Sequence, residues 1–273
     1  MIRKYLKSLV ILFGMAAILL TLANISRVDT ASANPPPTSL MVSLWRGDLG
    51  YARLANVSSG IPSIGWQPWS GPVGLSSFPG SGDIQAQSMF RVGQTLHQSY
   101  WRNNQGYSRT VPCAGGNPDW NNATAWSGPV GLSSFPGSGS IQAQGGVVIG
   151  STLYQEYWRN NQRYSRTVPI VSGQPDWNNA STWSGPVSLS GFPGSGNIQS
   201  QSSYVIYDFT FPNYLVEEYW RNNQGHSRTV PIVNGQPDWN NPGPWGGPFV
   251  PTLTGSGNVQ ATAGFDIPWF WCN

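Results

Sequence analysis

One phrase recurs through this chain and constrains its fold more than any other feature. Tyr-Trp-Arg-Asn-Asn-Gln occurs at 100–105, 157–162 and 219–224, and each copy is followed by Ser-Arg-Thr-Val-Pro, Pro-Asp-Trp-Asn-Asn and a Trp-Ser/Gly-Gly-Pro segment. The copies are 57 and 62 residues apart. Such a period indicates one supersecondary unit that buries its apolar face only against its neighbours. The sequence therefore predicts a ring or a stack, with function at equivalent sites or where the symmetry breaks.

A further copy is divided between the two ends of the chain. Leu-Trp-Arg at 44–46 aligns with Tyr-Trp-Arg at 100–102, so the first repeat begins in its middle. Its missing beginning matches residues 255–261, Gly-Ser-Gly-Asn-Val-Gln-Ala. A ring whose last unit takes strands from both termini has no free sheet edge. We therefore expect a strand near 258–265 to pair beside 40–46.

Within one repeat, apolar and polar residues alternate with a period of two. The runs 141–144, 153–159 and 164–168 are separated by Gly, Pro, Asn and Ser, which are typical of turns, and a weaker fourth run lies near 183–187. Four strands in about 57 residues are the content of one propeller blade with generous loops. The four Trp-Arg units predict an all-β fold, a single four-bladed β-propeller with about 57 residues per repeat, closed by its terminal strands. The alternatives are a trefoil, which needs three units, and a sandwich, which needs no repeat.

The N-terminal segment 1–33 has the features of a secretory signal peptide. It combines a basic start, an apolar run at 9–23 and Ala-Ser-Ala before Asn34. We expect cleavage, a propeller over 34–273, secretion, and no stable membrane insertion afterwards; an uncleaved anchor is the alternative. The segment also carries the whole formal charge of +3, because residues 34–273 hold ten Arg, no Lys and ten carboxylates. Nucleic acid and anionic membranes are therefore not expected as partners.

Two cysteines, Cys113 and Cys272, lie in the predicted secreted part. A disulfide between them would fix the C-terminus to the ring, and two separate thiols are the alternative. His97 and His226 have no ligand spacing around them, so no metal site and no cofactor are expected.

Two sets of tryptophans recur, and the sequence predicts different roles for them. Trp101, Trp158 and Trp220 lie in strands and are expected in the core. The other set lies in polar turns beside Asn pairs, where an indole face can stack on a sugar ring and the amides can bond its hydroxyls. These predicted sugar-binding residues are Trp120, Asn121, Trp177, Asn178, Trp239 and Asn240. The alternative is a turn Trp that folds back and fills the gap between blades; the first repeat lacks this segment, so at most three such sites are expected.

An arginine and an aspartate also recur once per repeat: Arg109, Arg166 and Arg228 with Asp119, Asp176 and Asp238. A repeated ion pair or turn cap is the simpler interpretation, and presentation to sugar hydroxyls is the other. No catalytic residue is expected, because the arginines follow the repeat and no nucleophile motif occurs. Glu217 and Glu218 are adjacent in a strand and should face opposite sides. The last full repeat carries five extra residues around 207–213, which should form a longer loop.

The blade pattern resembles that of bacterial PLL-type and tectonin-type propeller lectins. The resemblance covers nearly all of 34–273 and rests on Leu-x-x-x-Tyr-Trp-Arg-Asn at 96–103 and 153–160, its counterpart at 215–222, and the preceding Gly-Ser-Gly-x-Ile/Val-Gln. It implies a secreted sugar-binding propeller with sites between or on its blades. Blade number and repeat length differ, so no individual sugar ligand is carried over. We expect a multivalent, metal-independent lectin that binds glycans or glycoconjugates; the alternatives are a structural or adhesive protein-binding propeller and, behind it, a glycan-processing enzyme.

Overall fold

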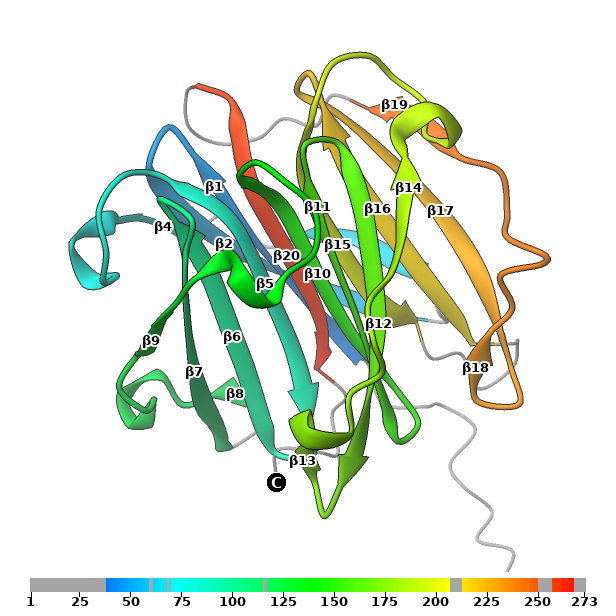
Figure 1. Ribbon diagram of the computed structural model, residues 1–273. Coiled ribbons are helices and arrows are strands. Elements are labelled where there is room, and N and C mark those ends of the chain that lie inside the picture. The colour runs from blue at the N-terminus through cyan, green and yellow to red at the C-terminus, as the bar shows by residue number, and fades with distance from the viewer. Residues whose placement is uncertain are drawn as a thin grey trace, which may run out of the picture. The chain divides into compact units, whose positions relative to one another are not determined.

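Four antiparallel sheets form a β-propeller of four blades, as the repeats predict (Figure 1). The computed structural model describes residues 38–58, 61–66, 68, 70–114, 117–206, 213–249 and 257–267. These all lie in one compact unit, residues 36–273, and contain twenty strands in sheets of five. The predicted signal segment, Cys272 and residues 207–212 of the long loop predicted at 207–213 lie outside the described residues.

The blades are numbered here in chain order. Blade 1 contains β20 (Val259–Ile267), β1 (Thr38–Arg46), β2 (Leu49–Ser58), β3 (Ile61–Trp66) and β4 (Ser70–Gly74). Blade 2 contains β5 (Ile84–Val92), β6 (Thr95–Arg102), β7 (Gln105–Ala114), β8 (Asn117–Pro118) and β9 (Ser127–Val130). Blade 3 contains β10 (Ile141–Ile149), β11 (Thr152–Arg159), β12 (Gln162–Val171), β13 (Gln174–Pro175) and β14 (Ser184–Ser188). Blade 4 contains β15 (Ile198–Ile206), β16 (Tyr214–Arg221), β17 (Gln224–Val233), β18 (Gln236–Pro237) and β19 (Gly246–Phe249).

The ring is closed by the two ends of the propeller segment. The last strand, β20, pairs antiparallel with β1, and Trp45 is the register partner of Ala261. β20 is thereby the innermost strand of blade 1, in the place that β5, β10 and β15 take in the other blades. The predicted pairing of 258–265 with 40–46 is confirmed, and the closure leaves neither strand an unpaired inner edge.

Each blade has three long strands and an outer layer made of two short pieces. In blade 3, β13 and β14 both pair with β12, one near each end of that strand. The weaker run predicted near 183–187 is β14, whereas the two-residue β13 was not predicted. The 3₁₀ helices are η1 (Leu75–Ser77), η2 (Trp120–Asn122), η3 (Leu132–Ser134), η4 (Trp177–Asn179) and η5 (Leu189–Gly191). Within the described residues, no helix has the length and apolarity needed to cross a membrane.

The repeated Asn-Asn pair forms a two-residue hairpin turn and also connects neighbouring blades. Asn160 and Asn161 have φ of 46° and 58°, the left-handed values that a tight type I′ turn needs and that Asn tolerates. The Oδ1 of Asn161 accepts from the backbone N–H of Ile198 at 3.1 Å, and its Nδ2 donates to Asn197 at 2.7 Å. The turn of blade 3 is therefore bonded to the start of blade 4.

The apolar core lies between the blades. Between blades 2 and 3 it contains Ala86, Trp101, Ile141, Tyr157 and Tyr164, all buried. The predicted core role of the strand tryptophans is confirmed, because the exposed fractions are 4% for Trp101, 1% for Trp158 and 4% for Trp220. Burial of a large apolar side chain contributes roughly 1.5–3 kcal/mol, so these interfaces hold the blades together.

Small side chains allow four inner strands to approach one another around the axis. Each of β5, β10, β15 and β20 packs against the next one around the ring. Gly146 of β10 is tightly enclosed, since a Cβ there would lie 3.0 Å from Ser88 Oγ and 3.1 Å from Phe90 Cδ1. The inner strands are therefore closely packed around the axis.

Candidate ligand-binding site

A pocket of about 910 Å³ lies between blades 2 and 3. Its two walls come from sheets that are consecutive in sequence and face each other in the ring. Blade 3 supplies Gln155, Tyr157, Arg166, Trp177 and Trp183, together with Phe135 from the segment that leads into its first strand. Blade 2 supplies Ser99, Trp101, Gly106, Ser108, Thr110, Thr124 and Ser127. We call this space the 2/3 pocket and the corresponding space between blades 3 and 4 the 3/4 interface.

The blade 3 wall is aromatic. Tyr157 and Tyr164 are register partners, as are Gln155 and Arg166, so strand alternation brings these side chains to one face. Trp183 packs edge-on against Tyr157 with ring centroids 4.6 Å apart. Trp177, at the start of η4, is 49% exposed and lines the pocket. A flat apolar surface is thus presented to solvent at the pocket.

Arg166 adds a cation to this aromatic wall. Its guanidinium carbon lies 4.3 Å from the ring centroid of Trp183 and 5.6 Å from that of Trp177. Its Nε donates to Oε1 of Gln155 at 2.9 Å. Burial lowers the pKa of Arg166, with Tyr157 opposing the shift, but a guanidinium stays charged at neutral pH. The terminal nitrogens of Arg166 can donate hydrogen bonds at the pocket wall.

The blade 2 wall is hydroxyl-rich. Ser108 Oγ lies 3.0 Å from Ser127 Oγ, and Thr110 Oγ1 lies 3.3 Å from Thr124 Oγ1. Gly106 is the register partner of Trp101, and the indole lies directly against this glycine, since a Cβ there would be 3.0 Å from Trp101 Cζ2. Hydroxyls both donate and accept, so this wall can bond a polar ligand that stacks on the opposite wall.

Gln144 joins the two walls at the inner end of the pocket. The indole N–H of Trp101 donates to its Oε1 at 2.5 Å, and its Nε2 donates to Ser99 Oγ at 2.6 Å. Both bonds connect β10 to β6, on different blades. These hydrogen bonds fix the inner end of the pocket, because a buried donor or acceptor that loses its partner destabilises the fold.

The turn tryptophans predicted to bind sugar are all at the surface. The exposed fractions are 41% for Trp120, 49% for Trp177 and 40% for Trp239, and the side chains of Asn121, Asn178 and Asn240 are also exposed. Trp177 lines the 2/3 pocket, whereas Asn178 does not. The polar partners for a ligand stacked on Trp177 come instead from Arg166, Gln155 and the hydroxyls of blade 2.

The third tryptophan of each complete repeat fills the gap between blades. Trp126, Trp183 and Trp245 are half-buried and pack against the interface clusters. The alternative that a turn Trp closes the gap therefore describes these residues and not Trp120, Trp177 or Trp239.

The repeated Asp and Arg have separate partners. Asp119 caps its turn, accepting from the backbone N–H of Asn121 at 3.2 Å and from Nδ2 of Asn122 at 2.6 Å. Arg109 stacks on Trp126, 4.3 Å from the ring centroid, and donates to Gln98. The turn cap is confirmed as the role of the aspartate, and the arginine pairs within its own sheet.

Sequence reasoning missed Gln155, Trp183 and the blade 2 hydroxyls as pocket residues. Alternation assigns Ser99 and Ser108 to the same face of a blade. The predicted ring contained the necessary information, because in a closed ring of repeats one face of each blade meets the opposite face of the next blade. Combining that rule with the strand register would have predicted the facing walls.

The adjacent carboxylates of blade 4 face different interfaces, as alternation predicts. Glu217 bonds Arg228 on the side of blade 3, with Arg228 Nη2 and Glu217 Oε2 2.6 Å apart. Glu218 accepts a hydrogen bond from Ser202 Oγ at 3.4 Å. It also interacts electrostatically with Arg53, a blade 1 residue, whose positive charge acts to lower the pKa of Glu218. The two carboxyl groups do not form an acid/base pair on one surface.

No group of three or more His, Cys, Asp and Glu with metal-binding geometry occurs among the described residues. The predicted disulfide stays a prediction, because Cys272 lies outside those residues. No protein-family model matches the chain, and no curated protein matches it. The case for a function therefore rests on the fold and on the pocket.

Proposed function

We propose that this propeller binds neutral carbohydrate, with the 2/3 pocket as a binding site. The observation that carries the proposal is the pairing of the half-exposed Trp177 with the hydroxyl-rich wall of blade 2 across one pocket. A pyranose has an apolar face and a rim of hydroxyls. Its face would stack on the indole, while its rim would find donors and acceptors in Ser108, Gln155 and Arg166.

The size of the pocket supports a small glycan. Small-ligand sites commonly have volumes of about 300–1,000 Å³, and 910 Å³ is at the upper end of that range. The described contacts of Arg166 are neutral or aromatic, so its charge strengthens bonds to hydroxyls without requiring an anionic group. One sugar stacked on one indole gains about 1 kcal/mol beyond its buried area, so single-site binding should be weak.

Repetition would raise the apparent affinity. Arg109 lies 4.3 Å from the ring centroid of Trp126 and 5.6 Å from that of Trp120, the same distances as in blade 3. Phe78 and Tyr100 complete the aromatic set between blades 1 and 2. Two or more such sites on a rigid ring give avidity toward clustered glycans. The proposed activity is therefore multivalent, metal-independent lectin binding by a secreted protein, in line with the leader sequence and with the resemblance to propeller lectins.

A protein-binding role is the second candidate. Val73, Val130 and Val187 are 50%, 53% and 50% exposed, and they occupy equivalent positions in β4, β9 and β14. A repeated apolar side chain on the outer strands suits contact with another protein.

A glycan array separates the two candidates. The secreted chain is applied to the array with and without free sugar, beside the Trp177→Ala variant and the triple variant Trp120→Ala, Trp177→Ala and Trp239→Ala. Carbohydrate binding predicts a signal that free sugar competes away and that the triple variant loses while its circular dichroism is unchanged. An absent signal, or one that the folded triple variant retains, would refute the proposal.

A further inference from the structure

One position distinguishes the 3/4 interface from the other three. Every blade has a core tryptophan in the second strand from the axis. Its register partner on the third strand is Gly50 in blade 1, Gly106 in blade 2 and Gly225 in blade 4, but Arg163 in blade 3. In the 2/3 pocket, Gly106 lies in the wall and places no side chain over the indole. Arg163 instead extends a long cationic side chain into the corresponding space beside Trp158.

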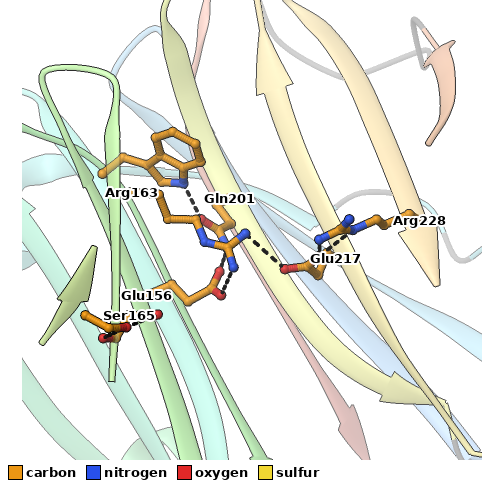
Figure 2. Close-up of polar contacts among 8 residues, drawn as sticks. Glu156, Arg163, Ser165, Gln201, Glu217 and Arg228 are labelled. Carbon is orange, nitrogen blue, oxygen red and sulfur yellow. Dashed lines mark hydrogen bonds and ion pairs between the residues drawn. The ribbon is translucent and has the colours of Figure 1, made fainter. Parts of the chain in front are cut away.

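Arg163 is held there by carboxylates from both blades (Figure 2). Its Nη2 lies 2.9 Å from Glu156 Oε1 of blade 3, and its Nη1 lies 3.4 Å from Glu217 Oε1 of blade 4. Glu217 is also bonded by Arg228. The exposed fractions of the side chains are 14% for Arg163 and 3% for Glu217. The guanidinium is therefore buried with its charge matched, the condition under which a buried ion pair is tolerated.

Three substitutions between equivalent positions build this cluster. Ser99, Gly106 and Gln155 of the 2/3 pocket correspond to Glu156, Arg163 and Glu217 of the 3/4 interface. The amides that close the inner ends also correspond: Gln144 bonds Ser99, and Gln201 bonds Glu156. The stacked arginine is retained in both places. Arg228 lies 4.4 Å from the ring centroid of Trp245, and Arg166 lies 4.3 Å from that of Trp183.

Arg163 also covers the aromatic surface that the 2/3 pocket leaves open. Its guanidinium carbon lies 5.6 Å from the ring centroid of Phe192, the equivalent of the pocket residue Phe135. Burial, with a contribution from Glu156, raises the pKa of Glu217, and Arg163 and Arg228 oppose the shift. Removal of Arg163 would deprive Glu156 of this cationic partner and leave Glu217 with Arg228 alone. Two largely buried carboxylates would then lose part of the positive charge that balances them.

We propose that Arg163 is a built-in occupant of the 3/4 interface, which fills the space that a sugar takes in the 2/3 pocket. The proposal rests on the proposed function and deepens it: the residue at position 106 or 163 decides whether an interface is open to ligand. Trp239, at the turn of blade 4, then lies beside a closed interface and contributes no sugar site, although its turn repeats the sequence around Trp177.

The test exchanges the two sets of residues. A closing variant carries Ser99→Glu, Gly106→Arg and Gln155→Glu, and an opening variant carries Glu156→Ser, Arg163→Gly and Glu217→Gln. Exchange of whole sets keeps each arginine with its carboxylates. Gly106→Ala is the matched control, because it adds one methyl group about 3.0 Å from Trp101 Cζ2 without filling the pocket.

Two probes are titrated into each folded variant by calorimetry and NMR: methyl glycosides of neutral hexoses, and the fluorescent dye 1-anilinonaphthalene-8-sulfonate, which needs an open aromatic space but no sugar recognition. The closing variant should lose one site per chain and the opening variant should gain one, with Gly106→Ala at the wild-type number.

If methyl glycosides bind the wild type and the site number does not change in either exchange, the proposal is wrong. If the dye follows the exchanges and no methyl glycoside binds, Arg163 closes the interface but the carbohydrate function fails. If neither probe binds the wild type, both proposals fail.

Discussion

The indole N–H of Trp45 donates a hydrogen bond to Oε1 of Gln87, 3.1 Å away across the interface between blades 1 and 2. Gln87 is 3% exposed, and its Nε2 donates in turn to Ser43 Oγ at 2.8 Å. Trp101 with Gln144 and Trp158 with Gln201 repeat the arrangement. The tryptophan that packs one blade therefore also bonds the innermost strand of the next blade.

Gln87→Leu should destabilise the propeller by about 1–3 kcal/mol, because it leaves the buried N–H of Trp45 without its acceptor. Urea denaturation measures the change. The double variant Trp45→Phe with Gln87→Leu removes both partners, so its loss should be smaller than the sum of the two single losses. Strictly additive losses would show that the hydrogen bond does not couple the two residues.

Removal of residues 255–273 should abolish cooperative folding. The truncation deletes β20, so β1 loses its partner and β5 and β15 lose the strand packed between them. Scanning calorimetry of the truncated chain checks this, with a chain ending at residue 267 as the control that retains β20. A melting transition equal to that of the control would contradict closure by β20.

Trp177→Ala should weaken sugar binding at the 2/3 pocket about five- to tenfold, because stacking contributes roughly 1 kcal/mol beyond area burial. Trp177 is 49% exposed, so the melting temperature should change little. Trp177→Phe keeps an aromatic face and should retain part of the affinity. NMR titration with a monovalent methyl glycoside measures each value without avidity; equal affinity for wild type and Trp177→Ala would remove the indole from the site.

Glu218 should make the fold less stable as the pH rises. Burial raises the pKa of Glu218 to about 7, with Ser202 and Arg53 opposing the shift. Between about pH 4.5 and 7 Glu218 therefore holds a proton in the folded protein that it has released in the unfolded chain, so its contribution to the free energy of unfolding falls across that window. The fall in that contribution should be of order 2 kcal/mol, since one pKa unit corresponds to about 1.4 kcal/mol and solvent still reaches part of Glu218.

Glu218→Gln removes this titration, so the stability of the variant relative to wild type should increase from pH 5 to pH 8. Urea denaturation at pH 5 and pH 8 compares the variant with wild type. Asp83→Asn, at an exposed position just before β5, is the control. Burial lowers the pKa of His97 and of His226, which raises stability with pH in both proteins alike, so only the difference between variant and wild type reports on Glu218. A difference that is the same at pH 5 and at pH 8 would overturn this assignment.

The repeats predicted the number of blades, the closing pair of strands and the buried tryptophans. These features depend on local rules, namely the period of the repeat and the alternation along each strand, and both can be counted in the sequence. The Asn-Asn turns also follow from a local rule. A two-residue hairpin turn needs positive φ, which Asn tolerates, and Asn160 and Asn161 have φ of 46° and 58°.

The pocket and its closed counterpart were decided by tertiary structure. Gln144 meets Ser99, and Arg163 meets Glu217 54 residues further along, because separate blades face each other in the ring. Alternation assigns each of these side chains to a face of its own sheet, but it does not say which residue of the next blade lies opposite. The sequence by itself thus determined the ring, and the packing of one blade on the next determined where the ring is open to a ligand and where Arg163 fills the space.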